Sequence, residues 1–175
     1  MDIKKLTHNL LNFFINRLIE ISGILITITG ILIFLALITY SPDDPNFIFP
    51  DNMEIKNLLG FQGSYSSDLL FQTFGLIAYL IPITFLFTGI NIFLRKDFFL
   101  LVENLFYSIL YLIFGTLFFS HFYKDAYTFY INGNGGFIGN YLDQTFLNNL
   151  VNNNIFYYVL IILIIFFTFL FTRRF

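Results

Sequence analysis

The chain has 175 residues, of which 57% are hydrophobic and only 11% are charged, and its formal net charge is −2. A soluble domain usually has about 25% charged residues, so this chain carries too few charges to cover a globular surface, and it is too apolar to be disordered. The small negative charge excludes a global basic field for nucleic acid, and the lack of cysteine excludes disulfides and thiol chemistry. We therefore expect an all-α integral membrane protein.

Four apolar runs are long enough to cross a bilayer, which takes about 20 residues. They cover residues 19–40, 69–93, 105–120 and 155–172 approximately. A hydrocarbon core leaves no water to satisfy backbone groups, so each run is predicted to be a helix. We treat residues 1–175 as a single four-helix membrane domain without a motor domain.

The basic residues predict the orientation of these spans. Seven of the nine Lys and Arg residues lie on one side, which by the positive-inside rule is the cytoplasm, and this side holds both termini. The seven are Lys4, Lys5, Arg17, Arg95, Lys96, Arg173 and Arg174; only Lys56 and Lys124 lie on the other side.

The N-terminal segment before the first span has an amphipathic pattern. Apolar residues recur at steps of three and four from Ile3 to Phe14, with Lys and Asn between them. This pattern predicts a helix that lies on the inner membrane surface. Arg17 and Glu20 share one helix face, so we expect them to form an interfacial ion pair.

A turn is predicted where the first span leaves the membrane, at Pro42, Asp43, Asp44 and Pro45. Two prolines end a helix, and Asp side chains favour turns. The two adjacent carboxylates leave a cation site open as an alternative, although the turn is the commoner use of such a sequence.

Small residues mark one face of each of the first two spans. The second span has Gly75, Pro82 and Gly89 at seven-residue spacing, with Ala78 near the same face, and the first span has Gly23 and Gly30 at that spacing. Small faces let helices approach closely in lipid, so we expect these faces to pack on each other or on a neighbouring protomer. Pro82 is expected to kink its helix.

The second outer loop contains the turn-rich cluster from Asn132 to Gly136. After it, apolar residues recur every four positions from Ile138 to Leu150. This predicts a short interfacial helix before the last span.

Residues for chemistry are missing from the chain. It contains no Walker A, H-E-x-x-H or Gly-x-Ser-x-Gly motif, so we expect no catalytic residue, no bound cofactor and no enzyme activity. His8 and His121 are well apart, which makes a metal site improbable. Glu103 and Asn104 are expected to cap the third span. No carboxylate lies at the centre of a span, which argues against a proton-coupled pump.

Several motifs occur in a suggestive order around these spans. They are Arg17-x-x-Glu20-x-x-Gly23, then Ser41-Pro42-Asp43-Asp44-Pro45, then Asn57-Leu58-Leu59-Gly60-x-x-Gly63-x-x-x-x-Asp68, then Phe74-Gly75-Leu76-Ile77-Ala78-Tyr79-Leu80-Ile81-Pro82, and finally Gly135-Gly136-x-x-Gly139. This order resembles the N-terminal four-helix membrane domain of the FtsK/SpoIIIE-type DNA translocases. Ser67 departs from the family pattern, which usually has Ala before the Asp, and residues 95–124 carry no family signature.

The resemblance implies a function. Such proteins use this domain as an anchor in the inner (cytoplasmic) membrane at the division septum, where they couple septum formation to chromosome segregation through a hexameric cytoplasmic ATPase. The resemblance implies that the chain is the membrane anchor of such a translocase and that it oligomerises, as a hexamer by resemblance to the family. Its expected partners are the lipid bilayer, further copies of itself and other cell-division membrane proteins, with no direct nucleic-acid contact.

An alternative from another class is a small-solute channel or the membrane subunit of a transporter. The glycines and Pro82 of the second span would then form a gate, with the outer carboxylates Asp43, Asp44 and Glu54 at its mouth.

Overall fold

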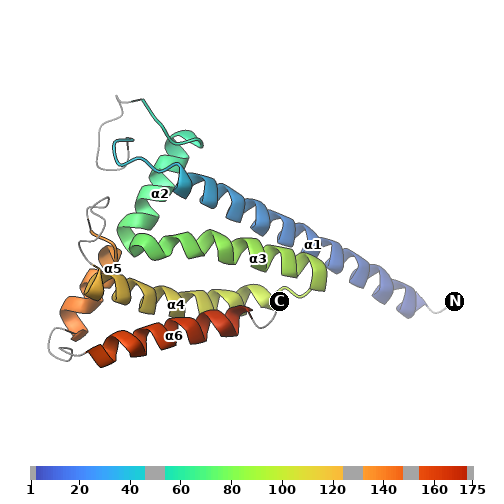
Figure 1. Ribbon diagram of the computed structural model, residues 1–175. Helices are drawn as coiled ribbons and strands as arrows, with labels where there is room; N and C mark the ends of the chain where they lie inside the picture. The colour runs from blue at the N-terminus through green and yellow to red at the C-terminus, as the bar shows by residue number, and fades with distance from the viewer. Residues whose placement is uncertain (1–2, 46–53, 124–131, 148–153, 173–175) are drawn as a thin grey trace.

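The computed structural model describes residues 3–45, 54–123, 132–147 and 154–172, and within these ranges all regular structure is helical. The four helices α1, α3, α4 and α6 lie side by side in that order, and α2 and α5 lie at one end of this row (Figure 1). The elements are α1 (Ile3–Ile38), α2 (Gly60–Phe74), the 3₁₀ helix η1 (Gly75–Tyr79), α3 (Leu80–Arg95), α4 (Phe99–Phe122), α5 (Gly136–Leu142), the π-helix η2 (Asp143–Leu147) and α6 (Asn154–Thr172).

Length and composition confirm the predicted all-α membrane fold. Three helical stretches of the described chain, Thr7–Ile38, Gly60–Arg95 and Phe99–Phe122, are long and apolar enough to cross a bilayer, and Ile155–Phe167 is a shorter apolar helix. Inside the first span, the hydroxyl groups of Thr27 and Thr29 find hydrogen-bond acceptors within their own helix. Each donates to the carbonyl oxygen four residues earlier. These threonines therefore do not interrupt an apolar helix.

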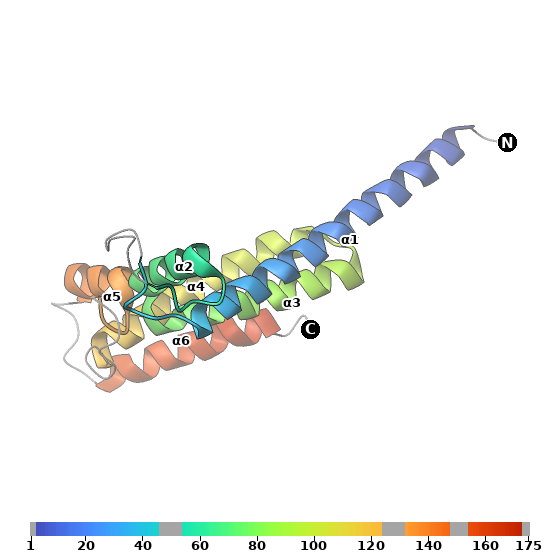
Figure 2. The same ribbon diagram turned by 90° about the horizontal axis from the view of Figure 1, so that it is seen from above.

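The N-terminal segment corrects one prediction, because α1 runs without a break from Ile3 to Ile38. The expected separate surface helix is replaced by one helix of 36 residues. This stretch contains no proline, so nothing ends the helix near Arg17. With a rise of about 1.5 Å per residue, such a helix is longer than a hydrocarbon core of about 30 Å. Figure 2 shows its N-terminal part extending beyond the bundle.

The second span also differs from the single helix expected over residues 69–93. The chain passes through α2, turns in η1, and continues as α3. Gly75 stands at the break with φ +66°, a conformation that favours glycine. Pro82 is buried in the first turn of α3, where a missing N–H does not disturb the helix. The expected kink at Pro82 is therefore a break at Gly75.

The inner turn between α3 and α4 makes the third span longer than the predicted residues 105–120. Lys96 ends α3 in a left-handed conformation with φ 57°, and its N–H donates to Ile92 O at 2.9 Å. Asp97 Oδ1 then accepts the N–H of Phe99 at 3.0 Å. Because these N–H groups have acceptors, the turn is stable, and α4 begins at Phe99 and runs antiparallel to α3.

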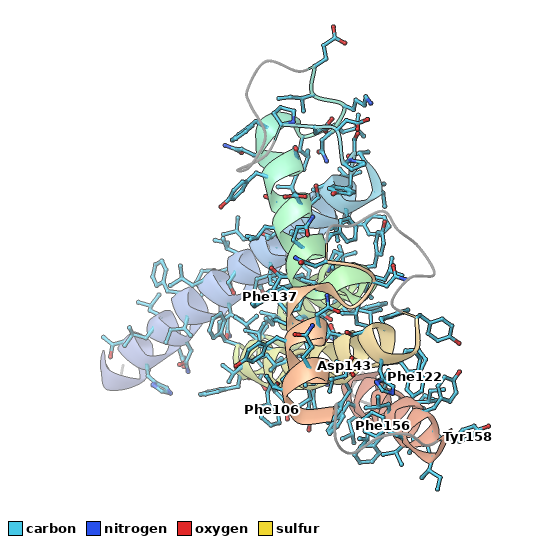
Figure 3. The ribbon with its side chains drawn as sticks, turned by 90° about the vertical axis from the view of Figure 1, so that its left-hand side faces the viewer. Phe106, Phe122, Phe137, Asp143, Phe156 and Tyr158 are labelled. Carbon is cyan, nitrogen blue, oxygen red and sulfur yellow. The ribbon has the colours of Figure 1, made fainter. Side chains whose placement is uncertain are left out.

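The predicted interfacial helix is represented by α5 and η2, which together cover Gly136–Leu147, while Leu150 lies outside the described residues. Figure 3 shows Asp143 of η2 beside Phe122 of α4 and Phe156 of α6. Asp143 Oδ1 lies 2.7 Å from His121 Nδ1 at the end of α4. This hydrogen bond holds the segment against the outer end of the bundle.

The buried core lies around the break in the second span. Leu37 of α1, Phe71 of α2 and Ala78 of η1 form one apolar cluster. Ile77 of η1 forms a second cluster with residues of α4, chiefly Tyr111. The elbow between α2 and α3 is thus packed between α1 and α4. Aromatic rings join α4 to α6, as in the stacked pair Phe114–Phe167.

Candidate functional site: helix crossings and polar junctions

The helices α1 and α3 approach closely where Gly23 and Gly89 face each other. A Cβ added to Gly89 would lie 2.6 Å from both Gly23 O and Thr27 N, and one added to Gly23 would lie 2.8 Å from Gly89 O. Two turns further along, a Cβ on Gly30 would lie 2.9 Å from Leu86 N. These three glycines therefore allow two backbones to touch within one chain.

Gly75 differs from the expectation that it packs against the first span, because it lies against the second outer loop. A Cβ added to it would lie 1.9 Å from Asn134 O, the atom that accepts the N–H of Leu76 at 2.9 Å. Gly136 also has a positive φ, +65°, and its added Cβ would lie 2.6 Å from Gly75 N. The loop crosses the break at this glycine pair, whereas Ala78 packs on α1.

Gly135 and Gly139 also occupy positions where a side chain would collide with a neighbouring backbone. A Cβ on Gly135 would lie 2.7 Å from Thr116 O, and one on Gly139 would lie 2.4 Å from the same oxygen. Nearby, Ser120 donates to Asn140 Oδ1 at 2.7 Å. The Gly-Gly-x-x-Gly stretch thus seats α5 directly on the outer end of α4.

On the inner side, Glu20 joins α1 to the turn that follows α3. Arg17 donates to Glu20 Oε2 as expected from their spacing, and Lys96 Nζ lies 3.0 Å from Glu20 Oε1. The Glu20 side chain is 12% exposed, while those of Arg17 and Lys96 are 56% and 43% exposed. Sequence spacing reveals only the local partner, because Lys96 is distant along the chain.

On the outer side, the Pro42–Pro45 segment forms a turn closed by the N–H of Asp44, which donates to Ser41 O at 3.2 Å. The carboxylate of Asp44 is 1% exposed and accepts the backbone N–H groups of Lys56 and Asn57, each at 2.9 Å. Asp43 is exposed, and its carboxylate lies 3.1 Å from Lys56 Nζ. Asp44 is engaged by two backbone N–H groups and Asp43 by the Lys56 ammonium, which does not favour the alternative of a shared cation site.

Asn57 connects the end of α1 to the start of α2. Its Nδ2 donates to Ala36 O at 2.9 Å and to Thr39 O at 3.3 Å, while its Oδ1 accepts the N–H of Leu59 at 3.1 Å. The last carbonyls of a helix lack intrahelical partners, so this side chain caps α1. A Cβ on Gly63 would lie 2.1 Å from Asn57 Oδ1, which explains the glycine there.

A row of buried polar side chains, which we call the polar seam, joins α3 to α4 and was not predicted from the sequence. Asn104 Nδ2 donates to Thr88 Oγ1 at 2.9 Å, and the hydroxyl of Tyr111 bonds to Thr84 and donates to Leu80 O at 3.2 Å. Asn104 therefore joins two helices and does not cap the third span. Its spacing from Tyr111, seven residues along one helix face, was the signal that could have located the seam.

Among the described residues, these arrangements hold helices together. Within the described ranges, no group of three or more His, Cys, Asp and Glu residues could hold a metal ion. Of the ion pairs in the described ranges, Glu20 with Lys96 joins α1 to the turn after α3, and His121 with Asp143 joins α4 to η2.

Residues 16–175 match the family described as the 4TM region of DNA translocase FtsK/SpoIIIE. Several curated proteins named DNA translocase FtsK are similar to parts of the chain. The protein from Rickettsia typhi is 35% identical over 82 residues, 45% of this chain and 11% of that protein. The protein from Vibrio vulnificus is 41% identical over 68 residues, 38% and 7% respectively. The chain therefore matches about a tenth of the length of these relatives, and no solved structure matches it.

Proposed function

Because the chain belongs to the family described as the 4TM region of DNA translocase FtsK/SpoIIIE, we propose that it anchors such a translocase at the division septum. In this role it assembles with further copies of itself and holds a cytoplasmic ATPase motor at the membrane. The observation that carries the proposal is the family match over residues 16–175, which takes in all four spans. The match concerns the membrane region of such a translocase and not its motor.

The arrangement of the spans supports the anchoring role. By the positive-inside rule we expect both termini on the cytoplasmic side. In the bundle, α6 runs from the outer end toward the inner turn at Lys96 (Figure 1). The last span thus directs the chain to the side where a motor would work on DNA. The contacts of α1 with α3 at Gly23 and Gly89, and the ion pair between Glu20 and Lys96, hold the spans in a fixed arrangement. A fixed arrangement of the spans would keep an attached motor at a defined place on the membrane.

We assign the residues singled out above to this scaffold. Gly23, Gly30 and Gly89 join α1 to α3. Asp44 and Asn57 fix the connection between α1 and α2 at the outer surface. In the proposed assembly, the exposed apolar faces of the spans contact lipid, neighbouring copies and other division proteins. Hexamers are the expected oligomer, by resemblance to the motor of the family.

The channel alternative gains no support from the second span. Its gate was placed at Pro82 and the neighbouring glycines, but Pro82 is buried in α3 and Gly89 is pressed against the backbone of α1.

The anchoring proposal is tested by exchanging membrane domains. Residues 1–175 would replace the membrane region of a resident FtsK-type translocase, with an unrelated four-span domain in the control strain. We expect the chimera to collect at midcell and the control to spread along the envelope. Equal spreading of both proteins would overturn the septal role. Counting photobleaching steps of the labelled chain in liposomes tests self-assembly separately, and single steps only would overturn it.

A further inference from the structure

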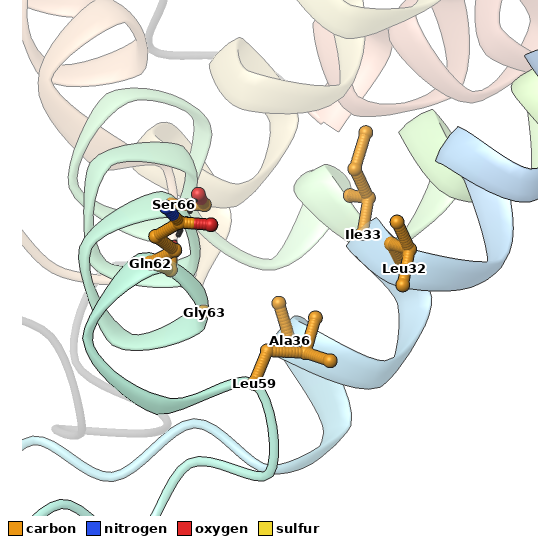
Figure 4. Close-up of a pocket in the computed structure, with 7 residues that line it drawn as sticks. All are labelled: Leu32, Ile33, Ala36, Leu59, Gln62, Gly63 and Ser66. Atoms are coloured by element: carbon orange, nitrogen blue, oxygen red, sulfur yellow. Dashed lines mark hydrogen bonds between the residues drawn. The ribbon is translucent and has the colours of Figure 1, made fainter.

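A groove opens between α1 and α2 near the outer end of the bundle, and Figure 4 shows its two walls. Its volume is about 280 Å³. The wall from α1 is apolar and consists of Leu32, Ile33 and Ala36. The opposite wall holds Leu59, which lies just before α2, and Gln62, Gly63 and Ser66 of α2, and the side chains of Gln62 and Ser66 are its polar groups. The groove is therefore mostly apolar, with hydrogen-bonding groups on the α2 side alone.

The groove lies at the boundary between hydrocarbon and headgroups. Glu20, with Arg17 and Lys96, marks the inner edge of the membrane. With about 1.5 Å per residue, Ala36 lies about 24 Å further along α1. A hydrocarbon core is about 30 Å thick, so the α1 wall reaches the outermost hydrocarbon and Gln62 stands close to the headgroups.

The α2 side of the groove has unused hydrogen-bonding capacity. Ser66 Oγ donates to Gln62 O at 2.6 Å, which leaves the lone pairs of this hydroxyl free to accept. The amide group of the Gln62 side chain has no hydrogen-bond partner within the described part of the chain. Gln62 is exposed, so at the level of the headgroups its amide is open to a polar group of a lipid.

The size of the groove selects among possible occupants. A helix from a second copy measures about 10–12 Å across, and a groove of about 280 Å³ would take in only a few of its side chains. An acyl chain is narrow enough to lie along the α1 wall. The residues named as its walls carry no charge, so binding would not depend on the charge of a headgroup.

We propose that this groove binds one outer-leaflet phospholipid. An acyl chain of the lipid lies along Leu32, Ile33 and Ala36. The amide of Gln62 donates to an ester or phosphate oxygen of the lipid, and Ser66 accepts from a headgroup or glycerol donor. The bound lipid fills the space between α1 and α2.

Native mass spectrometry of the 175-residue chain, released from nanodiscs of phosphatidylethanolamine and phosphatidylglycerol, tests this site. Ser66→Phe fills the groove, Gln62→Leu removes the amide at similar size, and Leu69→Phe is the matched control on the exposed side of α2. We expect one retained phospholipid in the wild type and the control, none in Ser66→Phe, and severalfold lower retention in Gln62→Leu. Circular dichroism confirms that each variant keeps its helices; if Ser66→Phe does not fold, Gln62→Leu carries the test.

Two results would overturn the proposal. One is equal lipid retention in wild type, Ser66→Phe and Gln62→Leu. The other is efficient disulfide dimerisation of a Gln62→Cys variant in membranes, because the chain has no native cysteine and such dimers would place a second copy at the groove. Retention limited to one headgroup class would contradict the uncharged lining.

Discussion

Removing the carboxylate of Asp44 should destabilise the fold far more than removing its neighbour. Asp44 is 1% exposed and accepts two backbone N–H groups at 2.9 Å, that of Asn57 in a buried position and that of Lys56 in a partly buried one. A buried donor left without an acceptor costs about 1–3 kcal/mol. Counting the buried donor at about 2 and the other at about 1 kcal/mol, Asp44→Ala should lose about 3 kcal/mol of unfolding free energy.

Asp43→Ala is the matched control. Its carboxylate is 73% exposed and pairs only with the Lys56 ammonium, and exposed pairs contribute about 0–1 kcal/mol. Asp44→Asn keeps one acceptor oxygen, so it should lose about half as much as Asp44→Ala.

The assay is reversible unfolding of the chain in mixed micelles with increasing dodecyl sulfate, followed by circular dichroism. The free energy of unfolding of each variant is compared with that of the wild type. Equal losses for Asp44→Ala and Asp43→Ala would refute the reasoning, because the turn would then not depend on the buried carboxylate.

Three further changes test the helix contacts in the same unfolding assay. Gly89→Ala should destabilise by more than about 2 kcal/mol, because its Cβ would meet backbone atoms of α1 at 2.6 Å, whereas Gly115→Ala should lose less because its Cβ meets a side chain alone; equal losses would contradict the backbone contact. Asn104→Leu should lose about 0.6–1.7 kcal/mol, the range measured for hydrogen bonds between helices in membranes, and a gain in stability would contradict its role in the seam. Glu20→Gln should weaken the link to Lys96 and lower the free energy of unfolding by about 1 kcal/mol. High salt screens the ion pair, so it should reduce this difference between wild type and variant by about half. A difference that does not change with salt would contradict the ion pair.

Local patterns made much of the fold predictable. Long apolar runs have few alternatives in a bilayer, so the four helical regions and the polar loops between them follow from composition. The seven-residue spacing of glycines also pointed to the contact between Gly23 and Gly89, because a small face repeats only along a helix.

The predictions that failed depended on contacts between distant residues. The break at Gly75 follows from the backbone of Asn134, which lies far along the chain and passes where a side chain would stand. Lys96 meets Glu20 because α3 packs beside α1, a contact that the sequence analysis did not include. The polarity of Asn104 suggested a helix cap, and only the position of α3 shows that it is a buried link.

The central claim is that these residues suffice to place a protein at the division site. The direct measurement is the position of a fluorescent protein fused to the C-terminus of residues 1–175, imaged in dividing bacterial cells at low expression, with the same fusion to an unrelated four-span protein as control. Our account predicts a midcell band in cells that are constricting and no band in the control. An even signal around the envelope at every stage of division would contradict it.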